Sequence, residues 1–131
     1  HAYRRSTEPT PGGTGRREVP LTPRNSVGVV GAYEREDWGR IGLEAYYTGR
    51  QELDDDPYRS ASARHVILGL LVDRRIGPLR VFVNAENILD TRQTRYDPLL
   101  RSARTPDGRW ITDVWAPLEG RSFNGGVWFS F

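Results

Sequence analysis

Alternation of apolar and polar residues constrains this chain more than any other feature of its sequence. It is clearest over residues 40–50. The residues of one set are apolar or aromatic: Ile41, Leu43, Ala45 and Tyr47. The residues between them are mostly polar: Arg40, Gly42, Glu44, Tyr46, Thr48 and Arg50. Because successive side chains of a β-strand point to opposite faces, this period predicts a strand with one apolar and one polar face.

Six segments follow this pattern, and connections rich in turn residues separate them. Most are about 10 residues long, the length that a tilted strand needs to cross the hydrocarbon core of a membrane. Soluble strands are shorter, at about five or six residues. We therefore expect an all-β fold of antiparallel, up-and-down strands that form the C-terminal part of a transmembrane β-barrel. The expected strands are 1–7, 26–35, 40–50, 65–75, 79–90 and 121–131.

The strands expected at 65–75 and 79–90 repeat the alternation less cleanly. In the first, the apolar face carries Val66, Leu68, Leu70 and Val72. In the second, Val81, Val83 and Ala85 oppose Arg80, Phe82, Asn84 and Glu86. We expect the apolar sets to face outward and the polar sets inward.

The connections discriminate between a barrel and a soluble sandwich, which would give the same alternation. They run long, short, medium, short and long, over 8–25, 36–39, 51–64, 76–78 and 91–120. Up-and-down strands then place every longer loop at one end, as outer-membrane barrels do with their extracellular loops. Single-chain barrels of this kind have at least about eight strands, so we expect this chain to be a piece of a larger barrel.

Composition excludes several classes of function. The chain has 19 basic residues, all arginine, against 17 acidic ones, and a net charge of +2 gives no single-sign field for nucleic-acid binding. No apolar run reaches the length of about 18 residues that a transmembrane helix needs. Cysteine is absent, so no disulfide or thiolate metal site is expected. Methionine is also absent and the chain begins at His1, which favours a processed or truncated piece.

The segment 124–131 resembles the assembly signal of outer-membrane barrels. That signal has a polar residue, a glycine two positions on, and aromatic residues at the antepenultimate and last positions, which here are Asn124, Gly126, Phe129 and Phe131. Outward Val127, Phe129 and Phe131 would meet lipid, with the aromatic rings near the membrane interface. The alternative is an edge strand of a soluble sheet.

A second motif, over 84–90, resembles the penultimate-strand motif of TonB-dependent receptors. Asn84, Asn87 and Asp90 occupy its polar positions, and Tyr96 lies where that family commonly has a tyrosine. Three further segments are similar to the family: the proline-arginine strand entry at 19–26, the tyrosine-glycine strand end at 44–50, and the glycine-arginine step at 120–121. Residues 1–17 carry no distinctive match.

The resemblance implies active uptake across the outer membrane of a Gram-negative bacterium. Such receptors are plugged barrels of about 22 strands that bind a scarce ligand outside and release it inward with TonB-derived energy. The implied ligands are siderophores, cobalamin or oligosaccharides. The implied partners are outer-membrane lipid, the rest of the barrel, a plug domain, the TonB complex and the barrel-assembly machinery. The plug domain and the TonB box of the family are not in this sequence.

Candidate ligand contacts lie in the loops. Trp110, Trp115 and Tyr96 are in the longest connection, where exposed aromatic rings supply binding area at low entropic cost, and Arg50 is a fourth candidate. The alternative is that these aromatic residues fold the loop onto itself. Inward polar residues, such as Arg40, Glu44, Arg80, Asn84 and Glu86, would contact a ligand or the plug, or would simply form a charge-balanced lumen.

Enzymatic and metal-binding interpretations are weaker. The run 54–56 has three aspartates, but its spacing is not that of a calcium-binding loop, and a solvated loop explains it. His65 and Asp73 lack a nucleophile elbow, so we expect no catalytic residues and no cofactor. Two other functions stay open: a soluble β-rich binding module, and an outer-membrane porin or enzyme without energy coupling.

Overall fold

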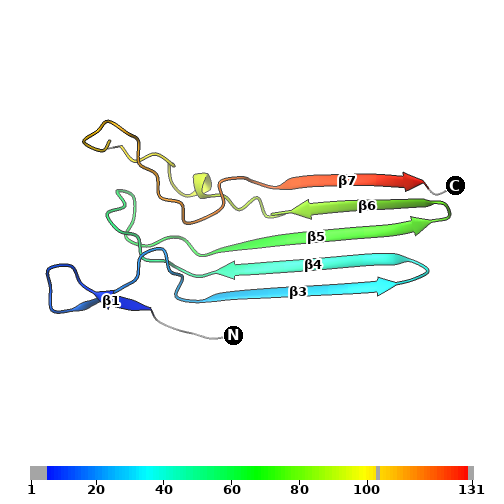
Figure 1. Cartoon of the computed structure of the whole chain (residues 1–131), viewed down its shortest axis with the longest axis horizontal. Coiled ribbons are helices and arrows are strands. Elements are labelled where there is room, and N and C mark those ends of the chain that lie inside the picture. The colour runs from blue at the N-terminus through cyan, green and yellow to red at the C-terminus, as the bar shows by residue number, and fades with distance from the viewer. Residues whose placement is uncertain (1–5, 103, 130–131) are drawn as a thin grey trace. The chain divides into compact units, whose positions relative to one another are not determined.

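The computed structural model describes residues 6–102 and 104–129, and within them the fold is all-β (Figure 1). Antiparallel strands form one sheet of five strands and one of two strands. A short 3-10 turn, η1 (Gln93–Arg95), lies in the longest connection. The part of the chain that the structure describes holds no helix with the length and apolar character of a membrane span.

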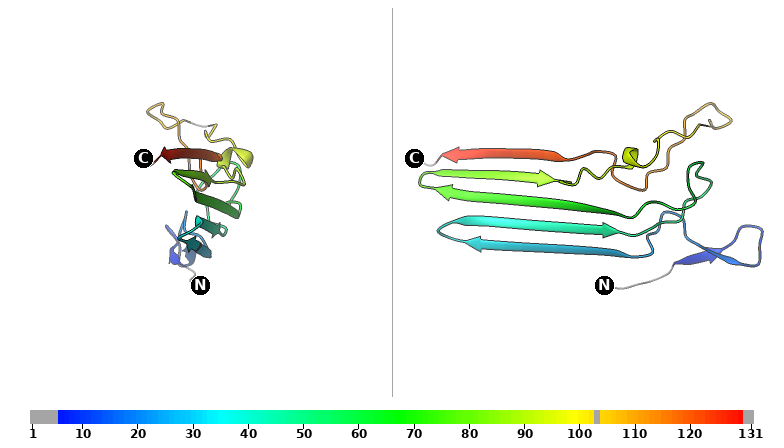
Figure 2. Two further views of the ribbon diagram at one scale, coloured as in Figure 1. Left: turned by 90° about the vertical axis from the view of Figure 1, so that its right-hand side faces the viewer. Right: turned by 180° about the vertical axis from the view of Figure 1, so that it is seen from behind.

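The five-stranded sheet follows the order of the sequence. Its strands are β3 (Ser26–Arg35), β4 (Gly39–Thr48), β5 (His65–Ile76), β6 (Leu79–Glu86) and β7 (Ser122–Phe129). Each strand pairs with its neighbours in sequence, which leaves β3 and β7 as the two edges of an open sheet (Figures 1 and 2). The expectation of antiparallel, up-and-down strands is confirmed for these five segments.

The N-terminal region differs from expectation. The strand expected at 1–7 falls mostly on residues 1–5, which lie outside the described residues. Thr7 instead begins β1 (Thr7–Pro9), which pairs with β2 (Arg16–Glu18) in a small hairpin, with Thr7 opposite Glu18. Ordered backbone pairing therefore occurs in a region where we expected a polar loop.

The end of one expected strand was wrong, and the end of another lies outside the described residues. We expected a strand to continue to Asp90, but β6 ends at Glu86. The reason is Asn87, whose φ of +48° is a left-handed conformation that stops an extended strand. At the other end, β7 stops at Phe129 within the described residues, and Phe131 lies outside them.

The chain divides into two compact units. The first, which we call the loop unit, comprises His1–Val27, Thr48–His65 and Arg92–Leu118. The second, the sheet unit, comprises Gly28–Tyr47, Val66–Thr91 and Glu119–Phe131. The hydrophobic cluster of Leu53, Trp115 and Ala116 belongs to the loop unit. The sheet unit has Ala85 as a buried apolar residue, so its strands are positioned by backbone pairing rather than by a core.

Candidate functional site

One face of the sheet unit is apolar across neighbouring strands. The register pairs Leu70 with Ala85 and Ala85 with Phe123, so these three side chains share a face. The same register adds Val72, Ile76, Leu79, Val81, Val83, Val127 and Phe129 to that face. Exposed fractions of 51% for Val83, 63% for Val127 and 64% for Phe123 show that this face is open to its surroundings. Arg74, near the end of β5, is a charged residue on the same face.

The opposite face of the sheet unit carries the charges. Arg80 forms a forked pair with Asp73, with nitrogen-to-oxygen distances of 2.7 to 3.0 Å. The Arg80 guanidinium also lies 5.9 Å from the ring centroid of Trp128, and Trp128 stacks on Phe82 at 4.9 Å. Arginine is suited to this double role because its planar group binds a carboxylate and stacks on an aromatic ring.

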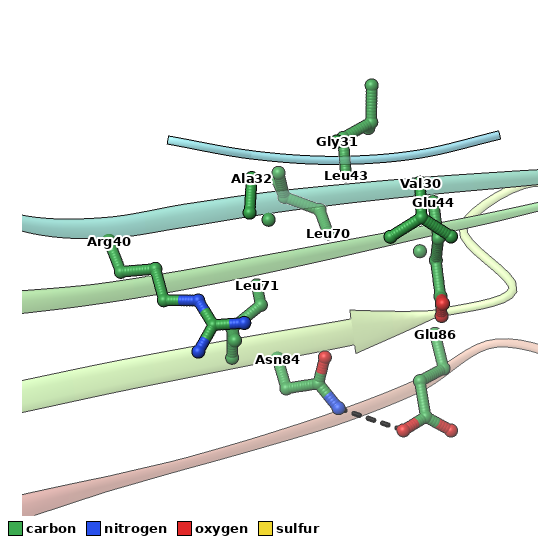
Figure 3. Close-up of a pocket in the computed structure, with 12 residues that line it drawn as sticks. Val30, Gly31, Ala32, Arg40, Leu43, Glu44, Leu70, Leu71, Asn84 and Glu86 are labelled. Carbon is green, nitrogen blue, oxygen red and sulfur yellow. Dashed lines mark hydrogen bonds between the residues drawn. The ribbon is translucent and has the colours of Figure 1, made fainter. Parts of the chain in front are cut away.

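A hollow of about 250 Å³ lies on this charged face (Figure 3). Arg40, Glu44, Asn84 and Glu86 line it, and the Asn84 amide donates to Glu86 Oε1 at 2.8 Å. Gly69 forms part of its floor, because a Cβ there would lie 2.6 Å from Glu44 Oε1. The structure therefore brings together four of the inward polar residues predicted from the sequence, with both charge signs present.

Asn87 and Asp90 of the motif at 84–90 form a cluster of hydrogen bonds just after the end of β6, which we call the clasp. Asn87 is buried, and its amide donates to the carbonyl oxygens of Thr91 at 2.7 Å and Glu119 at 3.2 Å. Its Oδ1 accepts the Thr91 backbone N–H at 2.9 Å. Asp90, with a φ of +55°, accepts the backbone N–H of Arg121. The two polar residues thus tie the start of the longest connection to its end, just before β7 begins.

The residues of the assembly-signal pattern have distinct places in β7. Asn124 lies opposite Asn84 on the charged face, and Phe129 lies opposite Leu79 on the apolar face. Gly126 lies opposite Phe82, where a Cβ would come within 2.5 Å of the Phe82 ring. A glycine at 126 therefore lets the Phe82 ring lie flat across the neighbouring strand. Phe131 lies outside the described residues.

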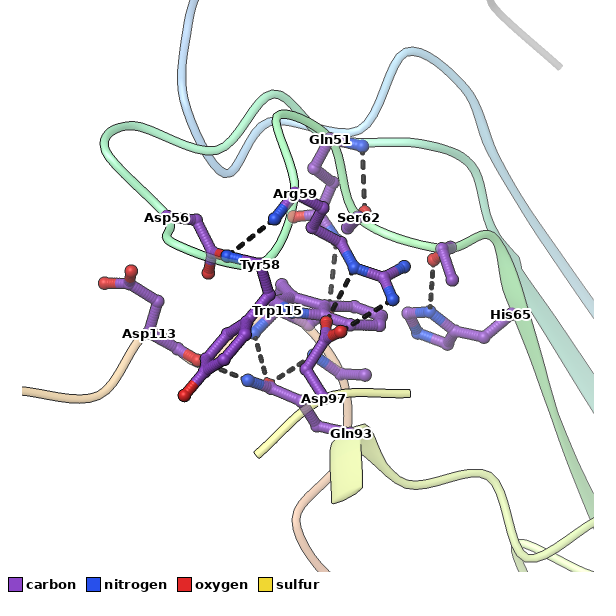
Figure 4. Close-up of polar contacts among 12 residues, drawn as sticks. Gln51, Asp56, Tyr58, Arg59, Ser62, His65, Gln93, Asp97, Asp113 and Trp115 are labelled. Atoms are coloured by element: carbon purple, nitrogen blue, oxygen red, sulfur yellow. Dashed lines mark hydrogen bonds and ion pairs between the residues drawn. The ribbon is translucent and has the colours of Figure 1, made fainter. Parts of the chain in front are cut away.

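The loop unit contains a buried polar network around Trp115 (Figure 4). Gln93 donates to the Asp113 carbonyl oxygen at 2.5 Å and accepts the Trp115 backbone N–H at 2.9 Å. Gln51 donates to the Trp115 carbonyl oxygen at 3.0 Å, across 64 positions of sequence. Two loops distant in sequence are therefore joined by side-chain amides that satisfy backbone groups, as buried polar groups require.

An ion pair completes this network. Arg59 contacts Asp97 with a nitrogen-to-oxygen distance of 2.7 Å, and the Asp97 side chain is 8% exposed. The Arg59 guanidinium lies 5.5 Å from the Trp115 ring centroid, and the Tyr96 ring lies 5.4 Å from the same ring. His65 also packs beside Trp115, at 6.3 Å between ring centroids.

The four predicted ligand contacts have different surroundings. Trp115 is 4% exposed and so presents no open ring surface; it folds the loop onto itself, which was the alternative for these aromatics. Trp110 is half-exposed and is stacked by the Arg104 guanidinium at 4.2 Å. Tyr96 is exposed on its side away from Trp115. Arg50 lines a separate pocket with Arg59 and Arg64, two arginines that were not predicted from the sequence to contact a ligand.

Two arginines of the loop unit, Arg17 and Arg101, form ion pairs with nearby carboxylates. Arg17 donates hydrogen bonds to the carboxylates of Asp54 and Glu8, which raise its pKa. Arg101 likewise donates to Asp113, which raises the pKa of Arg101, and it also donates to the Asp54 carbonyl oxygen at 3.0 Å. Within 6–102 and 104–129, no group of three or more acidic or histidine side chains is placed to hold a metal ion.

His65 and Asp73 belong to different units. His65 belongs to the loop unit and contacts the Ala63 carbonyl oxygen and the Trp115 ring. Asp73 belongs to the sheet unit and is engaged by Arg80.

The chain was compared with protein-family models, curated proteins and solved structures, and none of them matches it.

Proposed function

We propose that this chain forms the C-terminal part of the β-barrel of a TonB-dependent receptor, which takes up a scarce ligand across the outer membrane of a Gram-negative bacterium. The observation that carries the proposal is the exposed apolar face of the sheet unit. At about 25 cal/mol per Å² of apolar surface, an open face of this kind is unfavourable in water and favourable against hydrocarbon. A soluble binding module would need a second layer to cover it.

The order of side chains along the strands supports lipid as the covering. Leu70, Val72 and Val83 lie in the middle of their strands on the apolar face. Phe129 lies at the end of β7, opposite Leu79 at the start of β6. Aromatic rings gather at the two membrane interfaces while aliphatic side chains face the acyl chains, whereas a sandwich core has no such preference for its rims.

The lengths of β3, β4 and β5 give further support, while β6 and β7 are shorter than a full span. β3 and β4 have 10 residues each and β5 has 12, while β6 and β7 have eight each. A membrane strand tilted by about 45° needs about 9 to 11 residues. Short and long connections alternate along the chain. Short turns, such as residues 77–78 between β5 and β6, join the strands at one end, and the longer connections join them at the other.

The proposal of ligand uptake rests on the resemblance of this chain to TonB-dependent receptors. Asn84, Asn87 and Asp90 resemble the penultimate-strand motif of the family, and Asn124, Gly126 and Phe129 resemble the assembly signal of outer-membrane barrels. On this proposal the charged face lines the lumen, and the polar groups around the hollow face the plug. Ligands of the siderophore, cobalamin or oligosaccharide class, and the TonB complex as partner, follow from the same resemblance.

The test is uptake by cells that express the complete gene product. We expect the protein in the outer-membrane fraction, and we expect accumulation of its ligand to stop when TonB is deleted or the proton-motive force is collapsed. Uptake that continues without TonB would support an uncoupled porin instead. A chain that is a stable monomer in detergent-free buffer, with dispersed amide chemical shifts, would contradict the membrane assignment.

A further inference from the structure

The loop 50–64 forms a basic pocket with a volume of about 430 Å³. Three arginines line it, Arg50, Arg59 and Arg64, together with Ser60 and Ser62, and no acidic side chain is among its lining residues. The pocket lies wholly within the loop unit. Asp97 balances the charge of Arg59, so Arg50 and Arg64 give the pocket a local positive charge that the chain as a whole, with its near-even charge balance, does not have.

The walls of this pocket are held by backbone hydrogen bonds. The Ser62 N–H donates to the Gln51 carbonyl oxygen at 2.8 Å, and the Leu53 N–H donates to the Ser60 carbonyl oxygen at 3.0 Å. Asp56 Oδ1 accepts the backbone N–H groups of Tyr58 and Arg59, which fixes the turn at the loop tip. Because the loop is ordered before any ligand arrives, binding there costs little loop-ordering entropy.

The three arginines are not equivalent. Arg59 is committed to Asp97 and to the Trp115 ring (Figure 4). The side chains of Arg50 and Arg64 are exposed, and neither has a hydrogen bond or ion pair within the described residues. Their donors are therefore available at the pocket, while Arg59 is a fixed wall whose charge Asp97 already balances. Ser62 is 2% exposed, and its Oγ accepts the Gln51 N–H at 3.0 Å, so it belongs to the wall of the pocket, whereas Ser60 is exposed.

We propose that this pocket binds an oxyanion, a phosphate or carboxylate group, between the forks of Arg50 and Arg64, with the Ser60 hydroxyl as a further donor. Guanidinium forks match the two oxygens of such groups, and hydrogen bonds between opposite charges are the stronger kind. The same phosphate chemistry is presented by a small soluble anion and by a lipid headgroup. This inference does not depend on energy-coupled uptake.

The experiment uses the complete protein that contains this chain, purified folded in detergent, and two probes. Inorganic phosphate is the soluble probe, and phosphatidic acid in the micelle, against phosphatidylcholine, is the lipid probe. Binding is followed by the phosphorus NMR line width and by tryptophan fluorescence, because Arg59 joins the pocket to Trp115. We expect saturable binding of one probe, weakened roughly tenfold by Arg50→Gln or Arg64→Gln and roughly 100-fold by both.

Matched variants keep the result interpretable. Arg109→Gln removes the same charge from the loop unit at a residue outside the pocket, and it should bind like the native chain within about twofold. Arg50→Lys with Arg64→Lys keeps the charge and should retain part of the affinity. A response to inorganic phosphate identifies a soluble oxyanion, and a response only to phosphatidic acid identifies a headgroup. No saturable response to either probe, or native-like binding by the double glutamine variant, would overturn the proposal.

Discussion

The two units of this chain place their apolar residues differently. The loop unit buries a small apolar cluster, Leu53, Trp115 and Ala116, together with polar groups such as Gln93 and Asp97, and exposes charged groups such as Arg109. The sheet unit leaves Val83, Val127 and Phe123 more than half exposed, while its buried residues include Asn87 and Asp90. The loop unit thus has a buried apolar cluster, and the sheet unit has an uncovered apolar face. This distribution is expected when strands meet lipid and loops meet water.

The largest effect should come from removing the core of the loop unit. Trp115→Ala removes a 4%-exposed ring that contacts Tyr96, Arg59 and His65, and such a truncation costs about 3 to 5 kcal/mol. We expect rapid proteolysis within 92–118 while the strands stay protected, measured by limited digestion and mass spectrometry.

Two matched substitutions sharpen that result. Trp115→Phe keeps an aromatic ring and removes an indole N–H that has no acceptor within the described residues, so it should be much milder. Trp110→Ala, at a half-exposed ring, should leave digestion unchanged. Equal digestion of the three variants would mean that the loop unit has no core at Trp115.

The next effect concerns the faces of the sheet. Leu70→Arg places a charge on the apolar face and should cost about 2 to 4 kcal/mol if its position is near the bilayer midplane. Leu71→Arg is the matched control, because Leu71 pairs with Asn84 on the charged face. It is a better control than Gly69, where any side chain would collide with Glu44. Equal losses of folding free energy in lipid, measured by urea titration, would remove the distinction between the faces.

A smaller effect is expected at the clasp. Asn87→Ala leaves the carbonyl groups of Thr91 and Glu119 without their donor. It also places alanine, which cannot form the local hydrogen bonds of asparagine, at a φ of +48°. We expect the two effects to cost about 2 to 3 kcal/mol of folding free energy. Asn87→Gly loses the same hydrogen bonds but tolerates the backbone angle, so it should lose less. Thermal unfolding of both variants measures the difference. A glycine variant less stable than the alanine variant would contradict the left-handed assignment.

The smallest effect lies in the turn after β3. The pKa of Asp37 is lowered by its hydrogen bond to Arg35. A lowered carboxyl pKa stabilises the fold above the unfolded value of about 3.9, and this contribution is lost as the pH falls through the folded value. Because the pair is fully exposed, we expect Arg35→Gln to move the Asp37 carboxyl titration upward in NMR spectra with almost no change in melting temperature.

Local pattern predicted the sheet better than the loops. The period of two located the strands near 26–35, 40–50 and 65–75, because each residue's face is set by its own position in a strand. The core at Trp115 was less visible, since Gln51 and Trp115 are 64 positions apart and no short-range pattern links them. The pocket of Arg50, Arg59 and Arg64 was missed although its three arginines lie in one loop, because the course of the folded loop and not the spacing of the arginines brings them together.

The central claim is that the apolar face of the sheet unit meets hydrocarbon, and site-directed spin labelling tests it most directly. The chain has no cysteine, so single cysteines at Leu70, Leu71, Val72 and Asp73 give unique labels without background. In lipid bilayers we predict an alternating signal. Labels at 70 and 72 should collide with oxygen dissolved in the membrane, and labels at 71 and 73 with a water-soluble nickel complex. Labels at 70 and 72 that are as accessible to the nickel complex as those at 71 and 73 would contradict the account.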